Sequence, residues 1–408
     1  MIESERNKSP FFNKLSMAVL ATLPLLAWYK IPFPVGLGYA FILLLGTIAI
    51  VKNRFRVNVI PLAFWLMFAY VCFMWMYHHD FSFWTLFPPG GWMFFIFVLA
   101  VLWGVLAFDI GLLKKYMRWV VLISIALFWV QFGLKVTTGS QVYCFVPNLT
   151  GAFTYEEMSY SELAANQLLG ERPCSIFMEP SYMAHYFVTY LAIVWFDSVA
   201  QKKWLNKEII LIIITLIALK SGSGMVALAV LFAVKMFSMF WSANVGRRIL
   251  LISILIPLVI FVVDIYMGSE MGQMMLSRSN ELSTEGTSGF TRVVGGYLMF
   301  DQLDFNEKMI GIPDARERFG ILESDGSLFF FANGIQTILL SLGYLGALFF
   351  LVFYIVLFKK TSLASRMCII ILLVMSLIES NYLNPFMMLL TIIPCADYNY
   401  NKLIIRHK

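Results

Sequence analysis

The chain has 408 residues, of which 60% are hydrophobic and only 13% are charged. Soluble domains carry about 25% charged residues, so this composition excludes an ordinary water-soluble protein and indicates a chain embedded in lipid. Thirty Lys and Arg against 24 Asp and Glu give a formal net charge of +6. We attribute this excess to membrane topology and not to a surface that binds nucleic acid.

Apolar runs recur along the chain and approach the length of roughly 20 residues that a helix needs to cross a hydrocarbon core. They do not alternate as the strands of a membrane β-barrel do, and backbone groups in lipid must pair internally, which favours helices. We therefore predict an all-α polytopic membrane protein, with one membrane domain over residues 1–408 and about twelve transmembrane helices. In chain order the expected spans are 15–29, 33–51, 59–77, 91–110, 119–135, 179–199, 207–220, 222–241, 249–267, 333–358, 365–380 and 383–397.

Basic residues are retained on the cytoplasmic side of membrane proteins, so they test this arrangement independently. Seven groups of three, 21 of the 30 Lys and Arg, stand in alternate segments. The pattern places both termini in the cytoplasm and predicts an uncleaved first helix. These groups are Arg6, Lys8, Lys14; Lys52, Arg54, Arg56; Lys114, Lys115, Arg118; Lys202, Lys203, Lys207; Lys235, Arg247, Arg248; Lys359, Lys360, Arg366; and Lys402, Arg406, Lys408.

Two large outward loops, over residues 136–178 and 268–332, are expected on the opposite, periplasmic face. In the second loop, apolar residues at helical spacing predict an amphipathic helix over 288–302, which lies either at the membrane surface or on the loop's own core. In the first loop, Cys144 and Cys174 either form a disulfide in an oxidising compartment or remain apart.

Metal and nucleotide chemistry is not indicated. The sequence has no Cys-x-x-Cys, His-Glu-x-x-His or Walker motif, and its four histidines are scattered. The glycines in residues 222–227 fit a dinucleotide-binding pattern, but they follow an apolar helix and not a strand, so the required context is missing. We therefore expect no metal and no cofactor.

The stretch from Lys220 through Ser221 and Ser223 to Gly224 stands between two predicted helices at their outer ends. It is either a tight turn of a helical hairpin or an anion site. The anion site would use Lys220 and the backbone amides that begin the next helix to bind a lipid-linked diphosphate. The two interpretations are compatible.

Residues 172–181 join the first outward loop to a span that contains Tyr182 and His185. Pro180 suits the first position of a helix, so Glu179 either caps that helix or orients a sugar hydroxyl together with Tyr182. Both interpretations place the Glu179 carboxylate at the membrane edge.

Arginines of the two loops are the candidate phosphate ligands. Arg172, Arg278 and Arg292 are either interfacial and solvated charges or a cationic clamp, because a guanidinium offers a planar fork of donors to a diphosphate. Near the end of the second loop stands Asn333, and between the last two spans Glu379 is either a turn cap or a functional carboxylate.

These residues together resemble a family, the Wzy-type repeat-unit polymerases of O-antigen and capsule synthesis, within the wider set of lipid-linked oligosaccharide polymerases and ligases. Its members show an outward Arg-x-x-Ser-x-Phe-x-Glu-Pro-Ser element that opens a helix, a Ser-Gly-Ser-Gly-like turn, and a large outward loop with an essential Arg. The resemblance covers about residues 170–350. The residues that carry it are Arg172, Ser175, Phe177, Glu179, Pro180, Ser181, Ser221 to Gly224, Arg292, Gly311, Asn333, Gly334, Gly343 and Gly346.

The resemblance implies a glycosyl transfer at the periplasmic face of the bacterial inner membrane, without a nucleotide-sugar donor. The growing glycan on undecaprenyl diphosphate is the donor, and the terminal sugar hydroxyl of a new lipid-linked repeat unit is the acceptor. Membrane lipids, a chain-length regulator and a flippase are candidate partners. The implied catalytic residues are Glu179 as base, His185 and Arg292, and the implied substrate-binding residues are Arg172, Ser181, Tyr182, Lys220, Ser221, Ser223, Arg278 and Asn333.

Three other functions remain open. A ligase would move finished glycan to a different acceptor with the same architecture. A polysaccharide flippase or transporter would place polar residues at the bilayer midplane and show paired internal repeats, whereas here polar residues concentrate in the outward loops. A structural or sensory protein would tolerate neutralisation of its loop charges one at a time.

Overall fold

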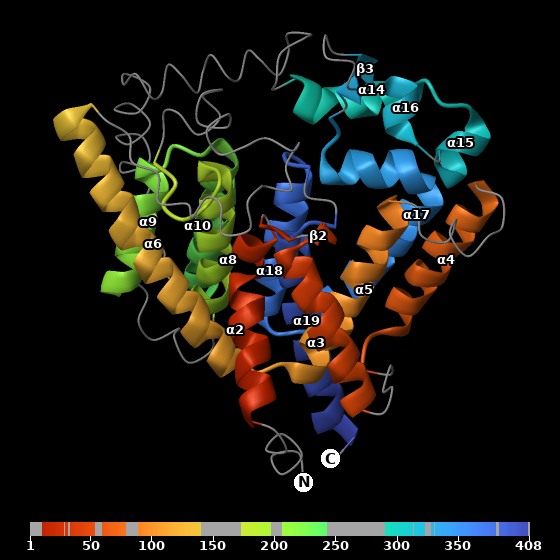
Figure 1. The fold of residues 1–408 in the computed structure, drawn as a ribbon. Coiled ribbons are helices and arrows are strands. Elements are labelled where there is room, and N and C mark those ends of the chain that lie inside the picture. Colours follow the sequence, from red (N-terminus) through yellow and green to blue (C-terminus); the bar gives the residue numbers. More distant parts are fainter. Residues whose placement is uncertain are drawn as a thin grey trace. The chain divides into compact units, whose positions relative to one another are not determined.

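The computed structural model describes residues 10–27, 29–31, 33–53, 59–78, 89–139, 173–196, 206–242, 290–312, 314–322, 328–329, 331–380 and 383–406. Over these residues the chain is mostly helical, with two short antiparallel strand pairs (Figure 1). The helices are α2 (Pro10–Leu26), α3 (Leu37–Lys52), α4 (Leu62–His78), α5 (Pro89–Ala107), α6 (Ile110–Thr138), α8 (Pro180–Trp195), α9 (Lys207–Ala218), α10 (Gly222–Ser242), η2 (Thr291–Gly295), α14 (Gly296–Asp301), α15 (Phe305–Ile310), α16 (Ala315–Phe319), α17 (Gly334–Lys360), α18 (Leu363–Ser376) and α19 (Pro385–Arg406). The strands are β1 (Lys30–Ile31), β2 (Phe33–Gly36), β3 (Ile321–Leu322) and β4 (Leu328–Phe329), and β1 pairs with β2 while β3 pairs with β4.

The predicted all-α class is confirmed over the described residues. Three helices of the described part are long and apolar enough to cross a membrane: Ile110–Thr138, Gly222–Trp241 and Gly334–Lys360. Every predicted span overlaps a helix except 249–267, which lies outside the described residues. The number of crossings and their orientation remain predictions.

The chain forms two compact units. The first comprises Met1–Leu228, Leu348–Val374 and Leu383–Lys408, and the second comprises Ala229–Ala347 and Met375–Tyr382. The boundary between the units falls within α10, α17 and α18.

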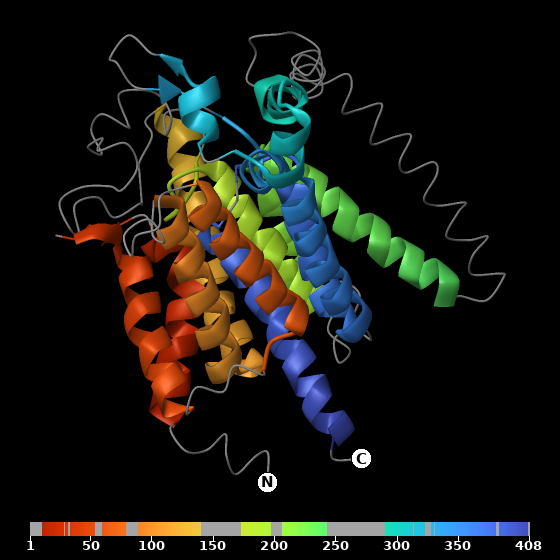
Figure 2. The same cartoon turned by 90° about the vertical axis from the view of Figure 1, so that its right-hand side faces the viewer.

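In the first unit, α2, α3 and α5 lie side by side, and α19 packs on α5 (Figure 2). Gly104 of α5 faces Ile392 of α19 so closely that a methyl group on Gly104 would overlap that side chain. Small residues at such points let helix backbones approach, which is how helices gain van der Waals contact in lipid. One buried polar contact also links this bundle, since Trp103 Nε1 donates to Ser16 Oγ at 3.0 Å.

In the second unit, residues 309–312 cross the start of α17 in direct backbone contact. Gly311 has φ 85° and Gly343 has φ 66°, and Gly343 interrupts the helical backbone of α17. The Ile312 amide donates to the Leu340 carbonyl at 2.8 Å, three residues before the non-helical backbone of Gly343. The two glycines therefore allow both the bend in α17 and the crossing.

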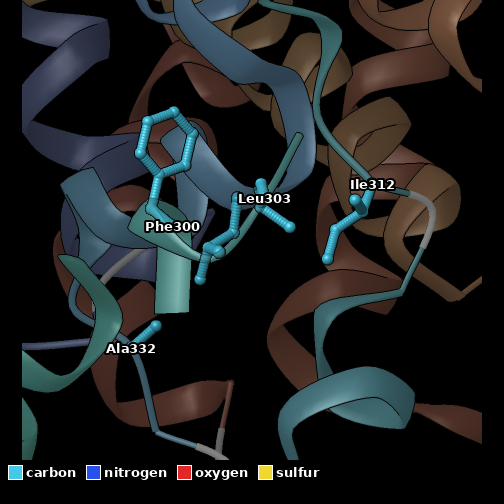
Figure 3. Packing of buried hydrophobic residues seen from close by; sticks show 5 residues of the cluster. Phe300, Leu303, Ile312 and Ala332 are labelled. Carbon is cyan, nitrogen blue, oxygen red and sulfur yellow. The ribbon is translucent and has the colours of Figure 1, made fainter. Parts of the chain in front are cut away.

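A small apolar core lies beside this crossing. It contains Phe300, Leu303, Ile312, Ala332 and Leu340, all nearly or fully buried (Figure 3). The Phe300 ring also packs edge-on against the exposed Tyr344, with centroids 5.1 Å apart. These contacts fix α14 on the first part of α17.

The predicted amphipathic helix over 288–302 is present as η2 followed by α14, which ends at Asp301. Phe300 packs into the loop's own core, whereas Tyr297 is 38% and Leu298 47% exposed. The packing alternative therefore holds for one face of the helix. The membrane-surface alternative for the other face remains a prediction.

Helix α15 is closed at its start by a reciprocal capping box. The Asp304 side chain accepts from the Glu307 amide at 2.8 Å, and the Glu307 carboxylate accepts from the Asp304 amide at 3.0 Å. Glu307 also pairs with Arg318. The bond from Arg318 and the bond from the Asp304 amide both favour the charged carboxylate and lower the pKa of Glu307.

Candidate functional site

The functional element predicted around Glu179 begins with a tightly held turn before α8. Ser175 is fully buried in the left-handed region, with φ 57°, and its amide donates to Gln131 Oε1 of α6 at 2.8 Å. Phe177 packs against Tyr186 of α8, whose hydroxyl donates to the Ala21 carbonyl at 2.6 Å. The Ser-x-Phe part of the motif therefore anchors the turn on α6 and α8.

Glu179 occupies the position just before α8 with an extended backbone, and Pro180 is the first helical residue, as predicted. Its carboxylate accepts no bond from the helix backbone. Instead, Glu179 Oε2 accepts from Ser181 Oγ at 3.0 Å. The carboxylate, which is only partly buried, is therefore not used as an N-cap hydrogen-bond acceptor.

One turn further, α8 meets the start of α10. His185 Nε2 lies 3.0 Å from Ser223 Oγ, which lies 3.5 Å from Ser221 Oγ. Ser221 Oγ in turn accepts from the Gly224 amide at 3.4 Å and so caps α10. All three side chains are buried.

Two close contacts hold this meeting point. Gly224 approaches Ala184 so closely that a methyl group on Gly224 would overlap the Ala184 side chain. From α19, the Phe386 ring stacks on Tyr182, with centroids 5.9 Å apart, and lies edge-on to His185 at 5.7 Å. We call the group formed by Glu179, Ser181, His185, Ser221 and Ser223 the α8 polar cluster.

Lys220 stands in the turn between α9 and α10 with φ 54° and an exposed side chain. The turn is short, since α9 ends at Ala218 and α10 begins at Gly222. The stretch is therefore a short turn between two helices, as one of the two interpretations expects. The compatible anion-site interpretation is not tested.

The second unit contains a different group of predicted residues. Asn333 is fully buried, and its side chain accepts from the Gln336 amide at 2.9 Å and donates to the Leu377 carbonyl at 2.9 Å. Because Asn333 is fully buried, a direct bond from its side chain to a substrate would need the surrounding residues to move. Arg292 belongs to η2, and the structure describes only its backbone.

The structure thus brings the predicted residues together in two hydrogen-bonded groups of the α8 polar cluster, Glu179 with Ser181 and His185 with Ser221 and Ser223, and Tyr182 lies between them on α8. Arg172, Arg278 and Cys144 lie outside the described residues. Cys174 is buried, with its thiol 3.9 Å from the Met178 carbonyl oxygen. The predicted arginine clamp and the predicted disulfide are therefore not tested.

Three residues of these sites were not predicted: Gln131, Gln336 and Phe386. The two glutamines were detectable in principle, because each is a polar side chain inside a predicted apolar span, where an unpaired amide is costly. Phe386 is one of 38 phenylalanines in the chain, and nothing in the sequence separates it from the others.

No metal site is evident, since the described residues contain no group of three or more His, Cys, Asp or Glu side chains that could hold an ion. Searches with protein-family models, among curated proteins and among solved structures found no match to this chain. At the start of α8, the Glu179 carboxylate can orient a hydroxyl and accept its proton, and an aromatic ring such as that of Tyr182 can stack on a sugar ring.

Proposed function

We propose that this protein polymerises oligosaccharide repeat units carried on undecaprenyl diphosphate, in the inner membrane of a bacterium. The observation that carries the proposal is the α8 polar cluster, in which Glu179 stands at a helix start with its carboxylate not engaged as a cap. Further along α8, buried His185 contacts Ser223. A polar group of this kind is unusual among helices that are otherwise apolar.

In the proposed reaction, Glu179 accepts the proton of the acceptor sugar hydroxyl as that oxygen attacks the anomeric carbon of the donor glycan. The bond from that carbon to the diphosphate oxygen breaks, and undecaprenyl diphosphate leaves with the electron pair. Arg172 and Arg292 stabilise the negative charge that develops on it. Tyr182 and the serines of the cluster orient the sugars.

The proposal includes the predicted topology of about twelve spans, with both termini in the cytoplasm and the two long loops in the periplasm. This orientation places the Arg172 to Ser181 element on the face where lipid-linked units arrive. Lipid tails would lie between helices, which explains why a sugar polymerase should be mostly membrane-embedded. A ligase shares this chemistry and differs in its acceptor.

The test is the glycan length made by cells that carry Glu179→Gln, Arg172→Ala or Arg292→Ala, at equal protein level. Loss of a general base costs on the order of 10²–10⁴-fold in rate, so we expect product stopped at a single repeat unit. Glu317→Gln, on an exposed carboxylate of α16, is the matched control and should leave long chains. Long chains in all three test variants would refute the proposal.

The same strains separate the polymerase from the ligase. If the protein is a ligase, the variants will accumulate long glycan that remains attached to its lipid carrier. If it is a polymerase, only single units will remain on that carrier.

A further inference from the structure

Two buried amide side chains tie the segment that contains Arg292 to the start of α17. Gln336 is fully buried, and its Nε2 donates to the Val293 carbonyl at 3.0 Å. Its Oε1 accepts from the Asn333 amide at 2.9 Å. We call the side chains of Asn333 and Gln336, with the backbone groups that they bind, the amide network.

The tied segment has an unusual backbone. Residues 291–295 form a π-helix, a conformation that is rare and occurs often at functional sites. Within this segment, the Val293 carbonyl accepts from a side chain of another helix. The Gln336 bond therefore stabilises the local backbone from which the Arg292 side chain extends.

Gly296 makes this contact possible. A methyl group on Gly296 would lie 2.5 Å from Gln336 Oε1 and 2.8 Å from Gln336 Cβ. Because the Gln336 side chain is confined on this side, its amide has one direction in which to donate. The small size of Gly296 and the bond from Gln336 are therefore both needed to hold α14 and η2 against α17.

We propose that Gln336 is a positioning residue, which holds the π-helix so that Arg292 is presented to the diphosphate of the lipid-linked donor. The inference rests on the proposed function for its chemistry. Gln336 does not touch the substrate and acts through Arg292. A glutamine is suited to this task because its side chain both donates and accepts, joining Val293 to Asn333 in one fixed geometry.

Asn333 offers a matched control because it reaches a different partner. Its Nδ2 donates to the Leu377 carbonyl in the segment after α18. In the same segment, the backbone carbonyl of Glu379 accepts from the Gly334 amide. Asn333→Asp keeps the oxygen that caps α17, removes this donor and sets a carboxyl oxygen against the Leu377 carbonyl, so it is the harsher of the two changes. It perturbs the same buried network without touching the bond to Val293.

The experiment compares Gln336→Met with Asn333→Asp in purified full-length protein. Methionine keeps the length and burial of the side chain and removes its bonds to the Val293 carbonyl and to the Asn333 amide. We expect amide hydrogen exchange over residues 291–296 to be faster by about 10-fold in Gln336→Met, through loss of a buried hydrogen bond. Asn333→Asp should leave this exchange unchanged.

Glycan synthesis from a lipid-linked repeat unit is the second measurement. Misplacement of a charge by about 1 Å can cost on the order of 10²-fold in rate, and we expect a loss of this order in Gln336→Met. A double-mutant cycle with Arg292→Lys then separates positioning from general damage. Positioning predicts that the double variant loses less than the product of the two single losses, whereas independent effects multiply.

The outcomes are distinct. If both Arg292 variants lower synthesis but Gln336→Met does not, the positioning role is wrong. It is also wrong if the loss in the double variant equals the product of the losses in Gln336→Met and Arg292→Lys. Equal faster exchange in Asn333→Asp would also contradict it, because the tie would then not be specific to Gln336. If Arg292→Ala leaves synthesis intact, the proposed function fails at this residue, and the exchange data separately report whether Gln336 holds the π-helix.

Discussion

At the residue scale, the contact between Gly224 and Ala184 decides how closely α10 approaches α8. The two residues lie where Ser223 meets His185, so this approach sets the 3.0 Å distance in the α8 polar cluster. A side chain one methyl group larger at Gly224 would need the helices to separate. The cluster therefore depends on a residue that has no polar group itself.

Moving the methyl group from one helix to the other tests this dependence. Gly224→Ala should destabilise the protein by about 1–3 kcal/mol, the usual cost of overpacking, and should lower glycan synthesis. The double variant Ala184→Gly with Gly224→Ala restores the total volume and should recover much of both losses. Thermal unfolding in detergent measures the first effect, and a double variant no better than Gly224→Ala would contradict the explanation.

At the element scale, α17 is shaped by the crossing of Gly311 and Gly343. Each glycine has positive φ, and a methyl group on either would overlap backbone atoms of the other segment. The bend opens the Leu340 carbonyl to the Ile312 amide. The same first part of α17 carries Gln336, so the bend also places the amide network.

Alanine at either crossing glycine should be strongly destabilising. Left-handed backbone strain and overlap with a neighbouring backbone together cost about 2–5 kcal/mol, and we expect Gly311→Ala and Gly343→Ala to lower the unfolding temperature or the protein level. Gly133→Ala is the control, since this glycine of α6 has open space around it. It should be neutral or stabilise by up to about 1 kcal/mol, as alanine does in a helix. Equal behaviour of all three variants would show that the crossing imposes no constraint.

At the scale of the whole molecule, the exposed surface of the long helices is apolar. On α6, Trp119, Ile123 and Val130 are each at least half exposed. In water this surface would cost free energy, whereas in lipid it is the expected exterior. Three helices of sufficient length therefore support a membrane setting, and the basic residues predict the orientation within it.

Reporter fusions test this orientation directly. Green fluorescent protein on the C-terminus should fluoresce, because the predicted C-terminus lies in the cytoplasm. Alkaline phosphatase, active only outside the cytoplasm, should be inactive when fused after Lys52 and active when fused after Gly139, in the first outward loop. Phosphatase activity at the C-terminus or after Lys52 would require a different number of crossings.

The sequence by itself determined the membrane class and most helix positions, because apolar runs and basic residues report directly on transfer into lipid. It also named Glu179, His185 and the serines 221 and 223 as candidate site residues, on two separate stretches that the family resemblance joined. Only the tertiary structure decided which of them touch. Contacts such as His185 to Ser223, Gly224 to Ala184 and Gln336 to Val293 join residues that are 38, 40 and 43 positions apart. Such pairs depend on how closely helix backbones approach, and that distance is set by packing, which hydropathy does not encode.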